Sequence, residues 1–303
     1  MGEQPPPGEG RTLIPLYGVN EGPAAYLLHV GSLNLLLDCG WSDDFDLSVL
    51  EPLKSLLSKG DSTQLDAILI SNSSLASCGA LPYVVGVLGC NVPIYATLPT
   101  VKMGRLTHYD TFSARHKNGL VEPFPLDAVD NTFETITPLK YSQHVQLRRY
   151  RGPSQAEETS PPETSEEGTV CVTPHPAGHL LGACYWHISA GETDDILYAL
   201  AFNNKPERHL PCVNFDKFQR PAALITSSRN ALTSVSRKQL DQFFSVRPVS
   251  RFPLGSGWVG AHLDHSTYTI VQTLRNNGNV LIPTDTAGRI LDRPGALAAL
   301  GSH

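Results

Sequence analysis

The sequence lacks any long apolar run. No apolar stretch approaches the roughly 20 residues needed to cross a bilayer, and residues 1–10 form a Pro/Gly/Glu tail without the basic-then-apolar pattern of a secretion signal. We therefore expect no membrane insertion and no secretion. We also expect this tail to be disordered, because it offers almost nothing to bury.

Paired cysteine motifs and an excess of positive charge are also missing. The six cysteines are scattered over 303 residues, and no two of them form a CxxC pair, which predicts reduced thiols in the nucleus or cytosol. The formal net charge of -6 gives no general attraction to phosphate backbones. Contact with nucleic acid would therefore depend on a local patch or on a partner.

What is present is an alternation of β-rich runs, turns and helical patterns, which predicts a layered α/β fold. The predicted strands of the first part are residues 12–17, 25–30, 33–38, 67–71, 93–96, 170–174, 185–189, 196–202 and 222–226. Helices are predicted from about Gly79 and over residues 101–115. From about Leu210 the pattern predicts a second α/β unit, with helices at 235–244 and 267–276 and a strand at 279–283.

One segment interrupts this pattern. Residues 152–168 read GPSQAEETSPPETSEEG and are nearly free of apolar side chains. The conformational entropy lost on ordering such a segment would not be offset by the burial of apolar surface. We expect a disordered acidic loop on the surface.

Two segments carry the main functional signal. NLLLDCGW, from Asn34 to Trp41, is a buried strand that ends in Asp38 and a glycine turn, and residues 70–82 read ISNSSLASCGALP. Together they resemble the metallo-β-lactamase superfamily, whose active members carry ISHxHxDHxGALP at the second segment and hold two zinc ions there. The resemblance implies an αββα sandwich.

The zinc ligands that this resemblance implies are replaced. Asn72, Ser74, Ala76 and Ser77 stand where active members have His, His, Asp and His, and none of the four offers the imidazole or carboxylate that zinc prefers. Without these donors we expect no catalytic zinc site and no metal cofactor.

Three further positions follow from the same resemblance. His179, in the PAGHLLG run, matches the family's third motif and keeps its histidine, for which we favour a hydrogen-bonded structural role. Ala201 stands where active members have the aspartate that bridges two metals, so a bridging hydroxide has no support. Asp38 is carried over as a structural residue that bonds N–H groups of the adjacent turns.

Collinear matches extend the resemblance from about Arg11 to Arg289. Runs such as GALPYVVGVLG from Gly79, VKMG from Val101 and DTAGR from Asp285 are similar to the non-catalytic metallo-β-lactamase/β-CASP subunits, the subunit 2 family, of the cleavage and polyadenylation specificity factor. The organisation implied is a lactamase-like domain over residues 11–210, then the first part of a β-CASP domain over 211–303. Residues 245–264 are an insertion in the family pattern.

The resemblance further implies that the chain is a pseudoenzyme and a scaffold subunit of the nuclear pre-mRNA 3′-end processing complex. Its implied partners are the zinc endonuclease subunit of that factor, a symplekin-like scaffold protein and pre-mRNA, the last contacted directly or through others. An inactive β-CASP subunit of another RNA-processing complex, such as Integrator, is the main alternative. Because only part of β-CASP is matched, we expect uncovered apolar sheet surface and an isolated chain that aggregates or needs a partner.

Two enzyme hypotheses compete with the non-catalytic scaffold hypothesis. Residues 255–260 satisfy GxGxxG, but no preceding strand or acidic residue supports a dinucleotide site. A rebuilt hydrolase metal site could draw on His175, His179, His187 and His209 with Asp38, although the prolines and glycine between the first two histidines disfavour a helix there. We prefer the non-catalytic hypothesis to both enzyme hypotheses.

The compact basic cluster of the chain is Arg148, Arg149, Tyr150 and Arg151. Such clusters can neutralise and stack on single-stranded RNA, so the three arginines are candidate RNA-contact residues. Pairing with the acidic loop that follows them is the simpler expectation.

Overall fold

The computed structural model describes residues 11–18, 22–58, 65–150, 170–191, 195–204, 210–218, 220–227, 272–273 and 275–279. The chain divides into a first compact unit of residues 1–227 with 286–288 and a second unit made of the remaining residues. Several predictions lie outside the described residues: the tail 1–10, the acidic loop 152–168, the insertion 245–264, the run 255–260, Arg151, His209 and most of the predicted β-CASP part.

The described part of the first unit contains two β-sheets and a set of helices. The strands are β1 Thr12–Pro15, β2 Tyr26–Val30, β3 Leu33–Leu37, β4 Ala67–Leu69, β5 Ile94–Thr97, β6 Thr137–Leu139, β7 Val145–Leu147, β8 Val170–Pro176, β9 Cys184–Ala190, β10 Asp195–Ala199 and β11 Ala223–Thr226. The helices are the 3-10 turn η1 Leu47–Leu50, α1 Glu51–Ser58, α2 Leu75–Cys78, α3 Leu81–Gly86, α4 Leu98–Lys117 and α5 Leu126–Thr135.

The first sheet has the order β1-β2-β3-β4-β5-β6. The opening meander β1 to β3 is antiparallel, and β3 to β6 are parallel. Because β3, β4 and β5 run in the same direction, the residues that follow them lie at one edge of the sheet. That edge is where Asp38, Ser71 and Leu98 are found.

The second sheet has the order β11-β10-β9-β8-β7. Its strands pair antiparallel except for β10 and β11, which are parallel, with Leu197 opposite Leu224. The strand β11 lies beyond residue 210, where the sequence suggested a domain boundary, and it still belongs to this sheet. That boundary stays a prediction.

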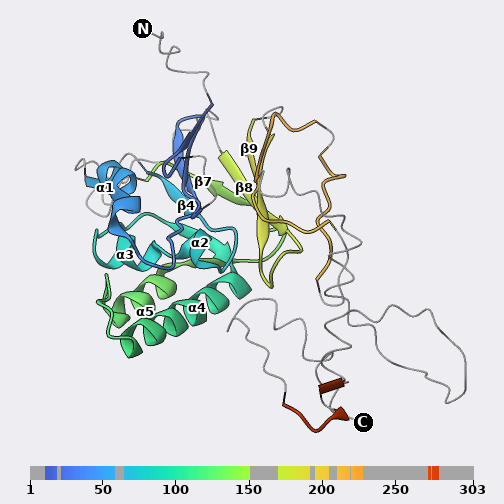
Figure 1. Cartoon of the computed structure of the whole chain (residues 1–303). Helices are drawn as coiled ribbons and strands as arrows, with labels where there is room; N and C mark the ends of the chain where they lie inside the picture. The colour runs from blue at the N-terminus through green and yellow to red at the C-terminus, as the bar shows by residue number, and fades with distance from the viewer. Residues whose placement is uncertain are drawn as a thin grey trace, which may run out of the picture. The chain divides into compact units, whose positions relative to one another are not determined.

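Two apolar layers hold the unit together. One lies between the first sheet and the helices, around Trp41, Leu81 and Phe133. The other lies between the two sheets, where Leu35 and Leu69 of the first meet Trp186 and Tyr198 of the second. Figure 1 shows this order of layers, with α3, α4 and α5 on one side of the first sheet and β7, β8 and β9 on the other. Among the described helices, none is both long and apolar enough to span a membrane.

The outer face of the second sheet is covered by the extended segment 210–218. Tyr185, Leu197 and Ala199 pack there against Val213, Phe215 and Phe218. The Tyr185 hydroxyl donates to Asn214 O at 2.7 Å, and Val213 N donates to Asn203 O at 2.8 Å. A second helical layer, which an αββα sandwich would have here, is not among the described residues.

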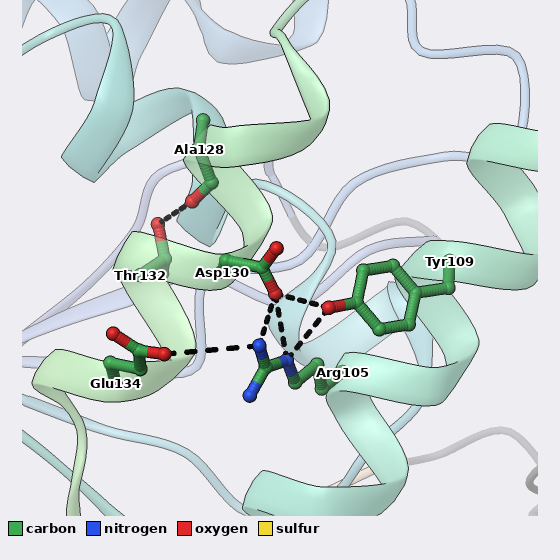
Figure 2. A network of polar contacts seen from close by, with 6 residues as sticks. All are labelled: Arg105, Tyr109, Ala128, Asp130, Thr132 and Glu134. Carbon is green, nitrogen blue, oxygen red and sulfur yellow. Dashed lines mark hydrogen bonds and ion pairs between the residues drawn. The ribbon is translucent and has the colours of Figure 1, made fainter.

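The helices α4 and α5 are joined by a polar network. Thr97 caps the start of α4 by accepting from Thr100 N, and three basic residues end the helix, in keeping with its dipole. Figure 2 shows Arg105 and Tyr109 of α4 converging on Asp130 of α5, while Glu134 lies 3.9 Å from the guanidinium. The helix α5 was not predicted from the sequence, although its buried positions Ala128, Val129, Thr132 and Phe133 have helical spacing.

Candidate functional site

The residues predicted to be degenerate metal positions lie on segments that meet at one edge of the sandwich. Cys184 N donates to Ser71 O at 2.8 Å and Asn203 N donates to Ala177 O at 2.9 Å. These bonds place the segment after β4 beside the loop between β8 and β9, and that loop beside the segment after β10. The fold therefore brings together the segments that carry Asp38, Asn72, His179 and Ala201.

Asp38 is the buried centre of this edge. Its Oδ1 accepts a bond from Ser71 N at 2.7 Å, and its Oδ2 accepts bonds from Ser71 Oγ at 2.7 Å and from Tyr198 Oη at 2.8 Å. The residue is fully buried and adopts a left-handed backbone with φ 59°. Burial raises the pKa of its carboxyl to about 6, against the opposing effect of hydrogen bonds from Ser71, Tyr198 and Ser77.

Asn72 and Ser77 are hydrogen-bonded to each other. The Asn72 amide donates to Ser77 Oγ at 2.9 Å and to Ser71 Oγ at 3.2 Å, and its carbonyl accepts from Ser74 N at 3.0 Å. Both side chains are buried. The two positions are therefore occupied by a neutral hydrogen-bonded network in contact with Asp38.

At the other two positions of this segment, Ser74 and Ala76, the side chains make no hydrogen bond among the described residues, and the backbone carries the contacts. Ser74 precedes α2 as its N-cap residue but makes no side-chain cap bond. Ala76 is exposed, and its carbonyl accepts from Ala24 N at 2.7 Å. A Cβ on Gly40 would lie 1.9 Å from that carbonyl oxygen, so glycine is required where the chain turns after Asp38.

His179 lies half-buried in the turn between β8 and β9, and Ala201 is half-buried just after β10. The turn is held at Gly182, whose carbonyl accepts from Thr97 Oγ1 at 2.6 Å and from Thr100 Oγ1 at 2.9 Å. Gly178 and Gly182 have φ of 67° and 85°, a region open to glycine at little cost. The turn that carries His179 is thus fixed to the start of α4.

The side chains at the predicted degenerate positions do not fit a zinc ion, and the Asp38 carboxylate beside them already accepts bonds from Ser71 and Tyr198. Zinc sites use imidazole, thiolate or carboxylate donors, normally three or four of them, whereas these positions supply an amide, hydroxyls, methyl groups and one imidazole. Among the described residues, no group of three or more His, Cys, Asp or Glu side chains is arranged to hold a metal.

Two histidines of the alternative metal site, His175 and His187, lie away from this edge. The ring of His175 stacks on Tyr185 with centroids 5.2 Å apart and lies 6.2 Å from the ring of His187, on the sheet face covered by Phe218. Asp38 bonds Tyr198 on the opposite face, between the sheets. Burial, with smaller effects from Lys217, His187 and His144, lowers the pKa of His175 to about 4, so this ring is neutral at pH 7.

The basic cluster lies at the other end of the strands. Tyr150 N donates to Asp66 Oδ1 at 2.9 Å, and Asp66 directly precedes β4, whereas Ser71 and Asn72 follow it. Arg148 and Arg149 are exposed, but the Tyr150 ring packs against the helix-side core. The structure therefore does not bring these arginines together with the degenerate metal positions.

Sequence reasoning missed Tyr198 and the two threonines. Tyr198 reads as an ordinary apolar strand residue, and its bond to Asp38 spans 160 residues. The signal that could have exposed it is its hydroxyl, because a tyrosine buried inside a sheet sandwich needs a partner for that group.

Comparisons with known proteins agree with this arrangement. A family model described as a metallo-β-lactamase superfamily domain matches residues 27–229. The chain is 38% identical over 275 residues to a probable cleavage and polyadenylation specificity factor subunit 2 of Drosophila melanogaster, covering 90% of this chain and 31% of that protein. It is 37% identical over 288 residues to the subunit 2 protein of Arabidopsis thaliana, covering 94% of this chain and 33% of that protein.

A more distant relative represents the alternative complex. Integrator complex subunit 11 of Danio rerio is 27% identical over 275 residues, covering 90% of this chain and 39% of that protein. The chain spans about a third of the length of the subunit 2 relatives. The predicted fold class and the predicted resemblance are confirmed: the chain belongs to the metallo-β-lactamase superfamily and, within it, is a homologue of subunit 2 of the cleavage and polyadenylation specificity factor.

Proposed function

We propose that this chain is a non-catalytic scaffold subunit of the nuclear pre-mRNA 3′-end cleavage and polyadenylation complex. In this role it works beside the zinc endonuclease subunit of the cleavage and polyadenylation specificity factor and a symplekin-like scaffold protein, and it helps to position pre-mRNA. The support is its similarity, at 37 to 38% identity, to subunit 2 proteins of that factor. The lower identity to an Integrator subunit favours the polyadenylation complex over the alternative.

One observation supports the non-catalytic part of the proposal. The positions of the metal motif carry Asn72, Ser74, Ala76 and Ser77. Asn72 donates to Ser77, and Ser77 in turn hydrogen-bonds Asp38. Zinc catalysis in a hydrolase requires an ion that lowers the pKa of a bound water and ligands that fix its geometry. A neutral network of amide and hydroxyl groups supplies neither.

Metal content tests this part directly. The chain, purified without chelators, is analysed by elemental mass spectrometry before and after incubation with zinc and dialysis. We expect far less than one metal per chain. One or two tightly held ions per chain that are lost on changing His179→Ala would show that other ligands have rebuilt a site, and would reopen hydrolase activity.

Affinity purification tests the scaffold part. A tagged chain expressed in cells is purified from nuclear extract, and its partners are identified by mass spectrometry. We expect the endonuclease subunit of the polyadenylation factor and a symplekin-like protein. Recovery of Integrator subunits without polyadenylation factors would favour the alternative complex instead.

A further inference from the structure

Two arginines form an exposed basic surface at the end of the sandwich remote from the degenerate metal positions. Arg148 and Arg149 directly follow β7, and both side chains are exposed. Neither makes an ion pair with a carboxylate of the described residues. Both guanidinium groups are thus without an acidic partner among the described residues.

This surface is built into the fold. Asp66, which is 2% exposed, accepts Tyr150 N at 2.9 Å through Oδ1 and Asn34 N at 2.7 Å through Oδ2. One buried carboxylate therefore fixes the arginine segment to the hairpin of β2 and β3. Both of its oxygens accept bonds from backbone N–H groups, and it makes no ion pair with either arginine among the described residues.

The neighbourhood adds polar and basic groups. Arg11 precedes β1, whose Thr12 lies opposite His29 in the sheet register, and His29 bonds the Asn34 side chain. The exposed residues of the hairpin turn are Gly31 and Ser32. Gly31 and Ser32 offer no apolar anchor of the kind that protein partners usually bind, and the exposed apolar side chains of this neighbourhood are Leu13 and Ile14 of β1.

The packing of Tyr150 limits how this surface could contact a nucleic acid. Tyr150 cannot stack on a base, because its ring packs against the core and its amide is bonded to Asp66. Arginines without an aromatic platform contact phosphates and read little sequence. A flexible polyanion fits this surface better than a structured protein partner.

We propose that Arg148 and Arg149 form a phosphate-contacting surface for single-stranded RNA. The choice of RNA rests on the proposed role in pre-mRNA processing. The surface lies at the start of β4, whereas the degenerate positions follow its end, so this chain holds RNA away from the place where active relatives would cut it. Contacts here are expected to be salt-sensitive and weakly sequence-dependent.

Fluorescence anisotropy with a fluorescein-labelled oligouridine tests the proposal on the full 303-residue chain. Arg148→Glu with Arg149→Glu is expected to weaken binding at least about tenfold, and the slope of log affinity against log salt should fall by about 0.7 for each lost phosphate contact. The conservative pair Arg148→Lys with Arg149→Lys should retain most of the binding. Circular dichroism should show that both variants keep the wild-type fold.

The matched control is Lys102→Glu with Lys140→Glu. Both lysines are exposed, the net charge changes equally, and they lie close to the ends of β5 and β6, the edge that carries the degenerate positions. We expect less than a twofold loss from this pair. The proposal is overturned if the wild-type chain does not bind the RNA, or if the lysine pair weakens binding as much as the arginine pair. RNA binding by the isolated chain and recovery of complex partners are separate readouts, so either proposal can fail without the other.

Discussion

Tyr198 donates a hydrogen bond of 2.8 Å to Oδ2 of Asp38 and so joins the second sheet to the first across 160 residues of chain. Asp38 follows β3, and Tyr198 lies in β10. At the edge where we propose that the metal ligands are replaced, this bond links the two sheets. The carboxylate is retained as an acceptor of hydroxyl and amide donors.

Removing the Tyr198 hydroxyl should therefore lower stability. Tyr198→Phe deletes one bond to a buried carboxyl, and such bonds contribute about 1.5–3 kcal/mol when the acceptor is charged. Urea unfolding monitored by circular dichroism measures the difference. Tyr26→Phe is the matched control, because its ring packs edge-on against Tyr198 but it is not one of the donors to Asp38. If both variants lost the same free energy of unfolding, the hydrogen bond from Tyr198 to Asp38 would make no specific contribution to stability.

The pKa of Asp38 predicts a pH dependence of stability. Burial raises this pKa to about 6 in the folded chain, above the ordinary value of about 3.9 in the unfolded chain. The folded state therefore holds a proton that the unfolded state has released, and the resulting stabilisation is complete below about pH 4 and is lost as pH rises through 6. At about 1.4 kcal/mol per pKa unit, the loss is about 3 kcal/mol.

Asp38→Asn isolates this effect, because asparagine does not titrate and tolerates the positive φ of the site. The stability of the wild type relative to Asp38→Asn should decrease between pH 4 and pH 7, as measured by urea unfolding at each pH. A difference that stays constant over this range would mean that the carboxyl does not titrate there.

Gly40 should tolerate no side chain. A Cβ at this position would lie 1.9 Å from Ala76 O and 2.5 Å from Ala76 C, and backbone atoms have little freedom to give way. We expect Gly40→Ala to cost about 3 kcal/mol or more, with loss of soluble protein or a much lower melting temperature. Gly22→Ala is the control, since nothing lies within 4 Å of its added Cβ. Wild-type stability of Gly40→Ala would contradict the tight approach of the two motif segments.

The elements predicted from sequence were those with strong apolar runs or motif glycines. The core strands β2 to β5 and the long helix α4 follow from such patterns. The short helix α1 and the helix α5 were missed, because no strong N-terminal capping residue marks α5 and its polar face dominates the segment. The pairing of β11 with β10 could not be predicted either, since sequence does not reveal which strands are neighbours in a sheet.

The same limit applies to the candidate site. The motif in residues 70–82 predicts which positions are replaced, and this stays a prediction. The partners of these side chains could not be named, since Tyr198, Thr97 and Thr100 reach the site only through tertiary packing. The burial of the Tyr150 ring, which removes it from the basic cluster as a stacking platform, likewise depends on the fold.

The network between α4 and α5 gives a prediction about electrostatics. Hydrogen bonds from the Tyr109 hydroxyl and then from Arg105 lower the pKa of Asp130. Its contribution to stability is therefore present at neutral pH and is lost as pH falls through the acidic range of that carboxyl. A double-mutant cycle of Arg105→Ala and Asp130→Ala should show favourable coupling at pH 7 that weakens with added salt.

Tyr109→Phe should reduce this coupling, because the hydroxyl contacts both charged groups. The exposed pair Glu51 and Lys54, three residues apart on α1, provides the comparison, and its coupling should be the weaker of the two. Stability of each variant is measured by urea unfolding at low and high sodium chloride. Coupling at Arg105 and Asp130 that equals that of the α1 pair, or that does not respond to salt, would show that the two helices are held together by their apolar contacts alone.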